Sequence, residues 1–388
     1  MQDFVFYNPV KIVFGRDATL RIGEETSRYA RNVMLLYGGG SARANGIYDK
    51  VCASLTDSGV DWTERGGVRP NPVLSFVRDS IRVFREKGLD GIVAVGGGSV
   101  IDTAKTIAAG VMYDGDPWDF FIEKATPVRA VPITVVLTLP AAASEMNCGA
   151  VITNELTLQK YHFISEQVFP KVSILDPVNT FTVPRDYSMF GAIDAIIHLL
   201  EGYFNCIETD MPVQDPYVEG LVRSIMRSAD KIYTSPKDYK ARADLMWAAT
   251  LALNGSASAG IGPTGFPMHM IEHSLSALYD VPHGAGLAIV SLAWMKYAYK
   301  ERKNRFTRFA EKIFDISDGE GEGVALEGIT ALERWYKSVS APVRLADIGV
   351  SREEIALISE NAYMTSVQWG LDGRYTRETI ADILELAA

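Results

Sequence analysis

The pattern of apolar segments changes near the middle of this 388-residue chain, and that change limits the folds open to it. In the first half, short apolar runs at 32–37 and 91–95 alternate with stretches of helical spacing such as 72–86. Strand–helix alternation of this kind predicts a parallel sheet with helices on both faces. After Pro184 strand signals nearly vanish. We therefore predict an α/β domain followed by an all-helical one.

The predicted domain boundary falls close to residue 180, which gives an α/β domain over 1–180 and a helical domain over 181–388. Within the first domain, alternating stretches at 150–153 and 159–165 predict a β-hairpin. The helices predicted for the second domain are 185–203, 216–233, 240–253, 268–279, 286–299, 303–314, 324–338, 352–362 and 377–386.

Charge and composition exclude several classes of protein. The net charge is −10, whereas nucleic-acid-binding proteins usually carry a basic surface. No apolar run reaches the length of about 18 residues that a membrane span requires. The three cysteines are widely spaced, which predicts neither a disulfide framework nor a cysteine zinc site. The first 15 residues lack the pattern of a signal peptide, so we expect a cytoplasmic protein.

Two GGGS segments, at 38–41 and 96–99, each follow an apolar run. The second opens into a predicted helix whose first turn contains Ser99 and Asp102. Glycines there let a phosphate approach the backbone, and the N–H groups at the start of a helix bind anions. The spacing matches neither GxGxxG nor GxxxxGK[ST]. These segments indicate a nucleotide site, although glycine-rich turns also occur where the backbone merely needs to bend tightly.

Four of the five histidines lie in the predicted helical domain, in unusually apolar segments. Asp194 and His198 are four residues apart, which places a carboxylate and an imidazole on one face of a helix. His269 and His273 repeat that spacing, and His283 follows in a turn. One carboxylate with several imidazoles favours Fe(II) or Zn(II) over magnesium or calcium. The alternative is that these histidines are core residues whose hydrogen bonds are satisfied within the protein.

The chain resembles the iron-containing alcohol dehydrogenases, in a superfamily with glycerol dehydrogenase and dehydroquinate synthase. The resemblance extends over essentially the whole sequence. It rests on NPVKIVFG at 8–15, GGGSVIDTAK at 96–105, LTLPAAASEMN at 137–147, LDP at 175–177 and the histidine segments. YGGGS at 37–41 is similar to the branch of butanol dehydrogenases and NADPH-dependent aldehyde reductases. The resemblance implies a dehydroquinate synthase-like fold, hydride transfer between a nicotinamide and an alcohol or aldehyde, and a homodimer.

The resemblance also implies residue roles. Asp194, His198, His269 and His283 match the metal ligands, and His273 matches a histidine beside the nicotinamide and the substrate, a candidate proton relay. The positions that match cofactor contacts are Gly38, Gly39, Ser41, Asn71, Gly97, Gly98, Ser99, Asp102, Thr138, Asn147 and Lys160. The chain departs from its relatives at Ala142, where a threonine hydroxyl is missing, and at 265–268, before His269.

The sequence also predicts a preferred cofactor and the polarity of the substrate, without identifying the substrate itself. Gly38 carries no charge, Ser41 can donate a hydrogen bond and Arg43 can reach a 2′-phosphate, so we predict that NADP(H) is preferred over NAD(H). Large side chains near the predicted sites favour a fairly apolar substrate; they are Trp118, Phe120, Phe121, Met146, Cys148, Phe266 and Met268.

Three alternatives to an alcohol dehydrogenase stay open at this point. A lyase similar to dehydroquinate synthase would need basic residues for its anionic substrate, and the histidine segments are poor in lysine and arginine. A zinc-dependent glycerol dehydrogenase would use one aspartate and two histidines. A protein that has lost catalysis would be expected to have lost ligands, yet all four matching positions are present.

Overall fold

The structure is a computed structural model that describes residues 1–206, 210–317, 319 and 321–388. Its contacts divide it into two compact units. The N-terminal unit contains residues 7–184 and 236–250, and the C-terminal unit contains 1–6, 185–235 and 251–388. Each unit thus combines separate stretches of chain, and the continuous division between residues 180 and 181 stays a prediction.

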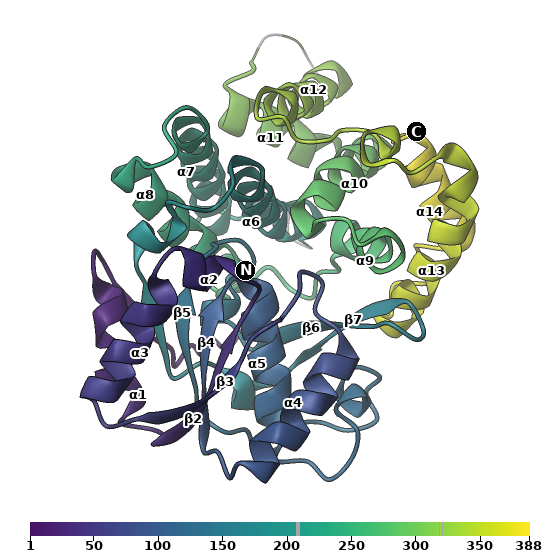
Figure 1. Ribbon diagram of the computed structural model, residues 1–388. Coiled ribbons are helices and arrows are strands. Elements are labelled where there is room, and N and C mark those ends of the chain that lie inside the picture. The colour runs from purple at the N-terminus through teal and green to yellow at the C-terminus, as the bar shows by residue number, and fades with distance from the viewer. Residues whose placement is uncertain (207–209, 318, 320) are drawn as a thin grey trace. The chain divides into compact units, whose positions relative to one another are not determined.

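A six-stranded parallel sheet forms the centre of the N-terminal unit, in the order β1-β8-β5-β4-β2-β3 (Figure 1). Its strands are β1 (Lys11–Phe14), β2 (Asn32–Tyr37), β3 (Asp61–Arg65), β4 (Gly91–Gly96), β5 (Ile133–Leu137) and β8 (Val172–Leu175). The helices of this unit are α1 (Ile22–Thr26), α2 (Ser41–Ala44), α3 (Ile47–Asp57), α4 (Leu74–Glu86), α5 (Gly98–Gly110) and α8 (Tyr239–Ala252).

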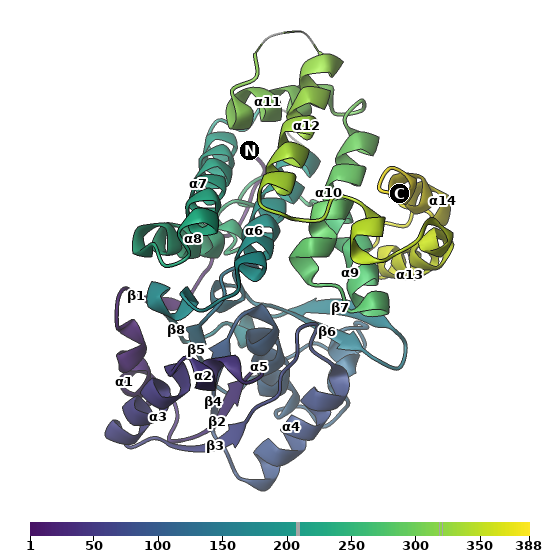
Figure 2. The same ribbon diagram turned by 45° about the horizontal axis from the view of Figure 1, so that its top comes forward.

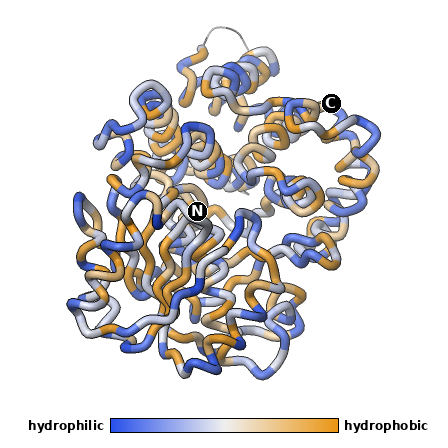
Figure 3. Tube along the Cα trace, viewed as in Figure 1, coloured by the Kyte–Doolittle hydropathy of each residue, from blue (hydrophilic) through white to orange (hydrophobic). Residues whose placement is uncertain are grey.

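Both faces of this sheet are covered, which explains the continuous apolar runs. Successive strand side chains point to opposite faces. Met34 and Leu36 of β2 pack with residues of α4 and α5, whereas Val33 and Leu35 pack with residues of α3. The central strands accordingly appear as apolar segments in Figure 3. The parallel sheet predicted from strand–helix alternation is confirmed.

The alternation of apolar and polar residues predicted the hairpin but not the two strands at the edges of the six-stranded sheet. β6 (Gly149–Asn154) and β7 (Gln159–Ile164) pair antiparallel, as expected from their alternation. β1 and β3 were not predicted. β3 lies at the edge of the sheet and reads DWTER, so its polar side chains reach solvent and it lacks an apolar signature.

The C-terminal unit is helical, as predicted (Figure 2). Within the described part of the chain, no strand follows Leu175. None of the described helices combines the length and the apolar character needed to cross a membrane. The helices of this unit are α6 (Arg185–Asn205), α7 (Gln214–Thr234), α9 (Pro267–Tyr279), α10 (His283–Ala298), α11 (Lys303–Phe314), α12 (Glu322–Ser338), α13 (Ile355–Gln368) and α14 (Arg377–Glu385).

Candidate active site

Three helices of the C-terminal unit contribute the predicted metal ligands. Asp194 and His198 lie one turn apart on the buried helix α6. His269 lies in the first turn of α9, which begins with Pro267, a residue suited to the first helical position. His283 is the first residue of α10.

A glycine lets α10 approach α6 closely enough to bring these ligands together. A Cβ atom placed on Gly284 would lie 2.1 Å from the carbonyl oxygen of Phe190 in α6. Any other residue would therefore push the start of α10 away from α6. Because Gly284 directly follows His283, this contact also fixes the distance between His283 and Asp194.

The three predicted histidine ligands converge on one carboxylate oxygen of the fourth ligand, Asp194. Oδ1 of Asp194 lies 3.0 Å from Nδ1 of His198, 3.6 Å from Nε2 of His269 and 3.8 Å from Nε2 of His283. Around a tetrahedral zinc ion, with bonds of ~2.1 Å, ligand atoms lie about 3.4 Å apart. The distances from Oδ1 to His269 and His283 are slightly longer than that value, and Nδ1 of His198 also lies 2.9 Å from the backbone oxygen of Asp194. Asp194, His198 and His269 each offer one ligand atom within 4.8 Å of the others, so this group fits a divalent metal ion, with His283 beside it.

Two of the converging atoms support this fit independently. Oδ1 of Asp194 and Nε2 of His269 are buried, and neither has a hydrogen-bond partner among the described residues. A buried polar atom without a partner is costly, and such atoms need an explanation such as an ion. A site of one carboxylate and three imidazoles suits iron or zinc.

Two buried glutamates, which the sequence analysis did not select, hold the outer nitrogens of these histidines. Oε1 of Glu201 lies 3.1 Å from Nδ1 of His269 and accepts the backbone N–H of the same residue at 2.9 Å. Oε2 of Glu272 contacts Nδ1 of His283. Carboxylates in this position fix the tautomer and orientation of a ligating imidazole. Their signal in the sequence is an acidic residue three positions after a histidine in an otherwise apolar helix.

Electrostatics favour a cation at this site. Burial opposes ionisation of Asp194, but the charges of His198 and His283 outweigh it, so the pKa of Asp194 lies well below its usual range. Burial also opposes protonation of His269, yet the carboxylates of Asp194 and Glu201 outweigh it and raise its pKa to about 9. Both shifts show that the site attracts positive charge.

The two remaining histidines lie outside this set of ligands. His273, on α9, is buried, and its ring centroid lies 5.7 Å from that of His283 and 5.4 Å from that of Trp369. It therefore lies beside one of the predicted metal ligands, and its role as a relay stays a prediction. His162 lies on β7 in the N-terminal unit, where burial lowers its pKa to about 4.

An aromatic side chain borders the ligand cluster. The ring of Phe266 lies 5.6 Å from that of His269 and 6.4 Å from that of His198, between centroids. Phe266 is one of the residues that we expected to line an apolar pocket. Phe120 and Phe121, by contrast, are buried in the core of the N-terminal unit and pack on Phe163.

The predicted cofactor residues gather at one edge of the parallel sheet, where the carboxyl ends of the strands lie. Nucleotides bind at this edge in α/β proteins. Gly97 and Gly98 form the start of α5, and a Cβ atom on Gly98 would meet only Ala142, at 3.9 Å. Ser41 is the first residue of α2, and Ser99 and Asp102 lie near the start of α5. The other predicted residues belong to the connections that follow the strands or to the hairpin; they are Gly38, Gly39, Asn71, Thr138, Asn147 and Lys160.

Several of these side chains already have partners within the protein. Nζ of Lys160 donates to Oδ1 of Asn71 at 3.0 Å. The carboxylate of Asp102 accepts the hydroxyl of Ser144 at 2.5 Å and the backbone N–H of Val151 at 3.0 Å. Their predicted contacts with a cofactor stay predictions.

Arg43 has a different environment from the one its sequence neighbours indicated. Its guanidinium pairs with Glu64 of β3 and lies 4.3 Å from the ring centroid of Tyr48. Its Nε donates to the hydroxyl of Tyr37 at 3.2 Å. Hydrogen bonds from Tyr37 and Arg43 lower the pKa of Glu64, so its carboxylate is ionised at neutral pH. The turn after β2 therefore contains a negative charge supplied by the neighbouring strand.

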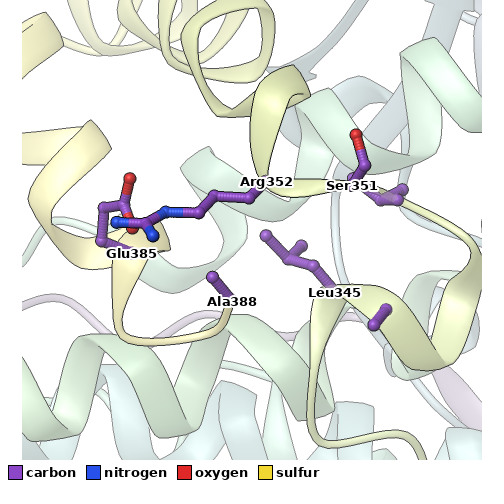
Figure 4. Close-up of a pocket in the computed structure, with 7 residues that line it drawn as sticks. Leu345, Ser351, Arg352, Glu385 and Ala388 are labelled. Atoms are coloured by element: carbon purple, nitrogen blue, oxygen red, sulfur yellow. The ribbon is translucent and has the colours of Figure 1, made fainter.

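A surface pocket of 420 Å³ in the C-terminal unit is lined by no histidine and by one glutamate, so it has no group of side chains like the histidine cluster (Figure 4). Its charged residues, Arg352 and Glu385, are exposed and pair with each other at 2.8 Å. We assign it no role in the reaction. Its lining residues are Leu345, Ala346, Val350, Ser351, Arg352, Glu385 and Ala388.

Comparisons with known proteins cover both units. The family model described as iron-containing alcohol dehydrogenase matches residues 9–177, and the model of the C-terminal region of that family matches residues 188–388. The sequence is 42% identical to a probable NADH-dependent butanol dehydrogenase of Bacillus subtilis, with 99% of each chain covered. It is 34% identical to an NADPH-dependent aldehyde reductase of Escherichia coli, over 100% of both. The crystal structure of an NADH-dependent butanol dehydrogenase from Thermotoga maritima superposes with a TM-score of 0.97 at 47% identity, covering 100% of this chain and 99% of that one.

Proposed function

The chain belongs to the iron-containing alcohol dehydrogenase family, and from this premise we propose that it reduces short apolar aldehydes to primary alcohols with NADH. Membership makes it a metal-dependent oxidoreductase that acts on alcohols or aldehydes with NAD(P)(H). The direction of the reaction, the substrate and the choice of cofactor are the proposed parts.

The observation that carries this proposal is the convergence of three imidazoles on the buried, unpartnered oxygen of Asp194. Asp194, His198, His269 and His283 would hold an iron or zinc ion. When bound, such an ion polarises a carbonyl oxygen or lowers the pKa of an alcohol. Glu201 and Glu272 keep the Nδ1 atoms of His269 and His283 engaged, so their Nε2 atoms stay directed at the site.

His273 is proposed to move the proton that the alcohol oxygen gains or loses. Its imidazole is buried beside His283, and an imidazole can both accept and donate a proton. General acid–base groups of this kind act through a direct hydrogen bond or one intervening water. Packing against Trp369 restricts the orientation of the ring.

Phe266 supports an apolar substrate. Its ring lies beside two of the proposed ligands, so a substrate bound there would contact an aromatic surface. Relatives named as butanol dehydrogenases agree with a chain of a few carbons.

The choice of NADH departs from the preference for NADP(H) that Gly38 and Arg43 led us to predict. That preference is not established, because relatives at 36–42% identity are named as NADH-dependent, whereas one at 34% is named as NADPH-dependent and another at 34% as NADP-dependent. In this chain Arg43 is paired with Glu64, so its charge is offset where a 2′-phosphate would bind. An ionised carboxylate at this turn disfavours that phosphate and can accept a ribose hydroxyl.

Steady-state kinetics with both cofactors test this choice. We expect kcat/KM to be higher for NADH than for NADPH in the wild type. Glu64→Gln removes the negative charge and releases Arg43, so the ratio of kcat/KM for NADPH over NADH should rise by about tenfold. Glu86→Gln is a matched control, because Glu86 pairs with Arg82 on the exposed surface of α4. A wild type that strongly favours NADPH, or an unchanged ratio in Glu64→Gln, would contradict the proposal.

The reaction itself is tested with protein purified without oxygen, stripped of metal and reconstituted with Fe(II) or Zn(II). Addition of butanal should cause metal-dependent loss of NADH absorbance, and glycerol with NAD should give a much lower rate. No butanal-dependent oxidation of NADH with either metal would overturn the proposed function, and faster turnover of glycerol would favour polyol oxidation.

The homodimer stays a prediction from the family resemblance, and the cytoplasmic location stays a prediction from the pattern of the first 15 residues. Light scattering on the eluted peak of a gel-filtration column would measure the mass directly, for comparison with the 42.6 kDa of one chain.

A further inference from the structure

Lys105 is a fully buried lysine on α5, in the N-terminal unit. Its ammonium group donates to Oγ of Ser144 at 2.9 Å, to Oδ1 of Asn147 at 2.8 Å and to the carbonyl oxygen of Gly149 at 2.7 Å. An ammonium has three hydrogens to donate. All three are therefore used. Two of the acceptors belong to the connection between β5 and β6, and the third, Gly149, is the first residue of β6.

This connection, residues 138–148, has no regular structure except a single turn at Ser144–Met146. Ala143 adopts the left-handed conformation, with φ of 50°. Asn147 accepts from Lys105 and from the N–H of Gly149, and it donates to the carbonyl oxygen of Ala142. Through these hydrogen bonds the side chain of Asn147 closes the connection into a loop. Lys105 on α5 holds that loop by donating to Ser144 and Asn147.

A carboxylate balances the charge of Lys105 through a shared hydroxyl. Ser144 accepts from Lys105 and donates to Oδ1 of Asp102, and Oδ2 of Asp102 accepts the N–H of Val151 in β6. Asp102 and Lys105 are neighbours on α5 at a spacing of three. Removal of one member of such a network leaves buried charge and buried hydrogen-bonding groups without partners.

The loop also lies next to the proposed phosphate site. α5 begins at Gly98, and the nearest side-chain atom to a Cβ placed there belongs to Ala142, within the loop. The same helix therefore provides the N-terminal N–H groups that face a pyrophosphate and, two turns later, the ammonium that holds the loop. A cofactor bound at the start of α5 would run past this loop.

We propose that Lys105 is a positioning residue, which holds the loop 138–148 so that Asn147 can bind the nicotinamide half of the cofactor. The inference rests on the proposed function, since it takes Asn147 as a cofactor contact. It assigns no contact between Lys105 and the cofactor. It differs from a purely structural role, because loss of Lys105 should affect the nicotinamide half of the cofactor and spare the adenosine half.

The test compares two ligands in Lys105→Met, which keeps an apolar chain of similar length without the ammonium. Isothermal titration calorimetry would measure Kd for NADH and for ADP, which has the adenosine and pyrophosphate but lacks the nicotinamide half. We expect Kd for NADH to rise about tenfold, as for loss of hydrogen bonds to a charged group, and Kd for ADP to change less than about twofold. Lys124→Met is the control, because Lys124 pairs with Asp119 at the surface.

Equal weakening of NADH and ADP, or no weakening of either, would overturn the proposal. If Lys105→Met does not fold, Ser144→Ala removes one acceptor and the bridge to Asp102; it should weaken NADH more than ADP, and an equal effect on both would overturn the proposal. Asn147→Ala distinguishes the claim that Asn147 contacts the cofactor from the claim that Lys105 positions Asn147. A normal Kd for NADH in Asn147→Ala would remove Asn147 from the cofactor site, whereas weak binding in Asn147→Ala with normal binding in Lys105→Met would refute the inference about Lys105 alone.

Discussion

The histidine cluster of the C-terminal unit and the lysine network of the N-terminal unit both bury charged groups. They differ in whether the buried polar atoms have hydrogen-bond partners. Around Lys105 every ammonium hydrogen has an acceptor. In the histidine cluster, Oδ1 of Asp194 and Nε2 of His269 are buried without a hydrogen-bond partner. The first arrangement is complete and stabilises a loop, whereas the second needs a cation. The unpartnered atoms of the histidine cluster lie among further side chains that can bind a metal, and this combination, not the missing partner alone, indicates a binding site.

The largest effect expected from this comparison is loss of the metal. His269→Ala and His283→Ala should each abolish turnover and lower the bound metal measured by elemental analysis, because each removes one of four ligands. His162→Ala should retain the metal and the activity, since His162 lies on β7 in the other unit. A normal metal content in either ligand variant would break the comparison.

His273 tests whether a histidine beside the cluster acts on the proton without binding the metal. In His273→Ala we expect kcat to fall by about 10²–10⁴-fold while the metal content stays normal. Loss of metal would instead make His273 a ligand, and a change in kcat below about threefold would indicate a packing role.

Glu201 tests the contribution of a carboxylate that does not itself face the proposed metal site. It contacts Nδ1 of His269, whereas Nε2 of His269 faces Asp194. Glu201→Gln keeps the acceptor for the backbone N–H of His269 and removes the negative charge. Metal affinity, measured by competition with a chelator, should fall about 10–100-fold. Glu219→Gln is a suitable control, because Glu219 is also a buried glutamate of this unit and pairs with Arg308 instead of a histidine. Equal affinity in both variants would show that Glu201 does not tune the site.

The smallest expected effect concerns the stability of the lysine network against pH. Burial lowers the pKa of Lys105 to about 8, against the opposing charge of Asp102. An unfolded lysine keeps its proton up to about pH 10.4, so between these values the unfolded state binds more protons. Its contribution to the free energy of unfolding should therefore rise with pH in this window, by on the order of 1–3 kcal/mol.

Denaturant titrations of the wild type and Lys105→Met from pH 7.5 to 10 would measure this contribution as a difference between two curves. Parallel curves would show that the ammonium is held at its ordinary pKa. The wild type should gain stability relative to the variant as the pH rises.

The sequence predicted what depends on local spacing. Asp194 and His198 are one helical turn apart, so their common face follows from the helix itself. Strand–helix alternation likewise predicted the parallel sheet. Glu64 could not be found in this way, because it is 21 residues from Arg43 and reaches it only through the pairing of β2 with β3.

Glu201 and Glu272 were missed for another reason. Both lie in segments already selected for their histidines, but a carboxylate in an apolar helix has no assigned role until its partner is known. The partner of Glu201 is 68 residues away, and that of Glu272 lies across the turn between α9 and α10. Lys105 ends the GGGSVIDTAK motif, yet its three acceptors are 39 to 44 residues distant in the sequence.

The helix α8 has a consequence for the order in which this protein can fold during synthesis. The N-terminal unit takes its residues 236–250 from the second half of the chain. Within them, Thr250 donates to buried Glu145, and Trp247 lies against Phe14 of β1. A ribosome that has released only residues 1–184 has exposed the whole sheet, but Glu145 still lacks this donor. The unit should therefore reach its final stability only after α6, α7 and α8 have emerged. Until then the N-terminal unit of the nascent chain should be incompletely folded and more easily cleaved by a protease.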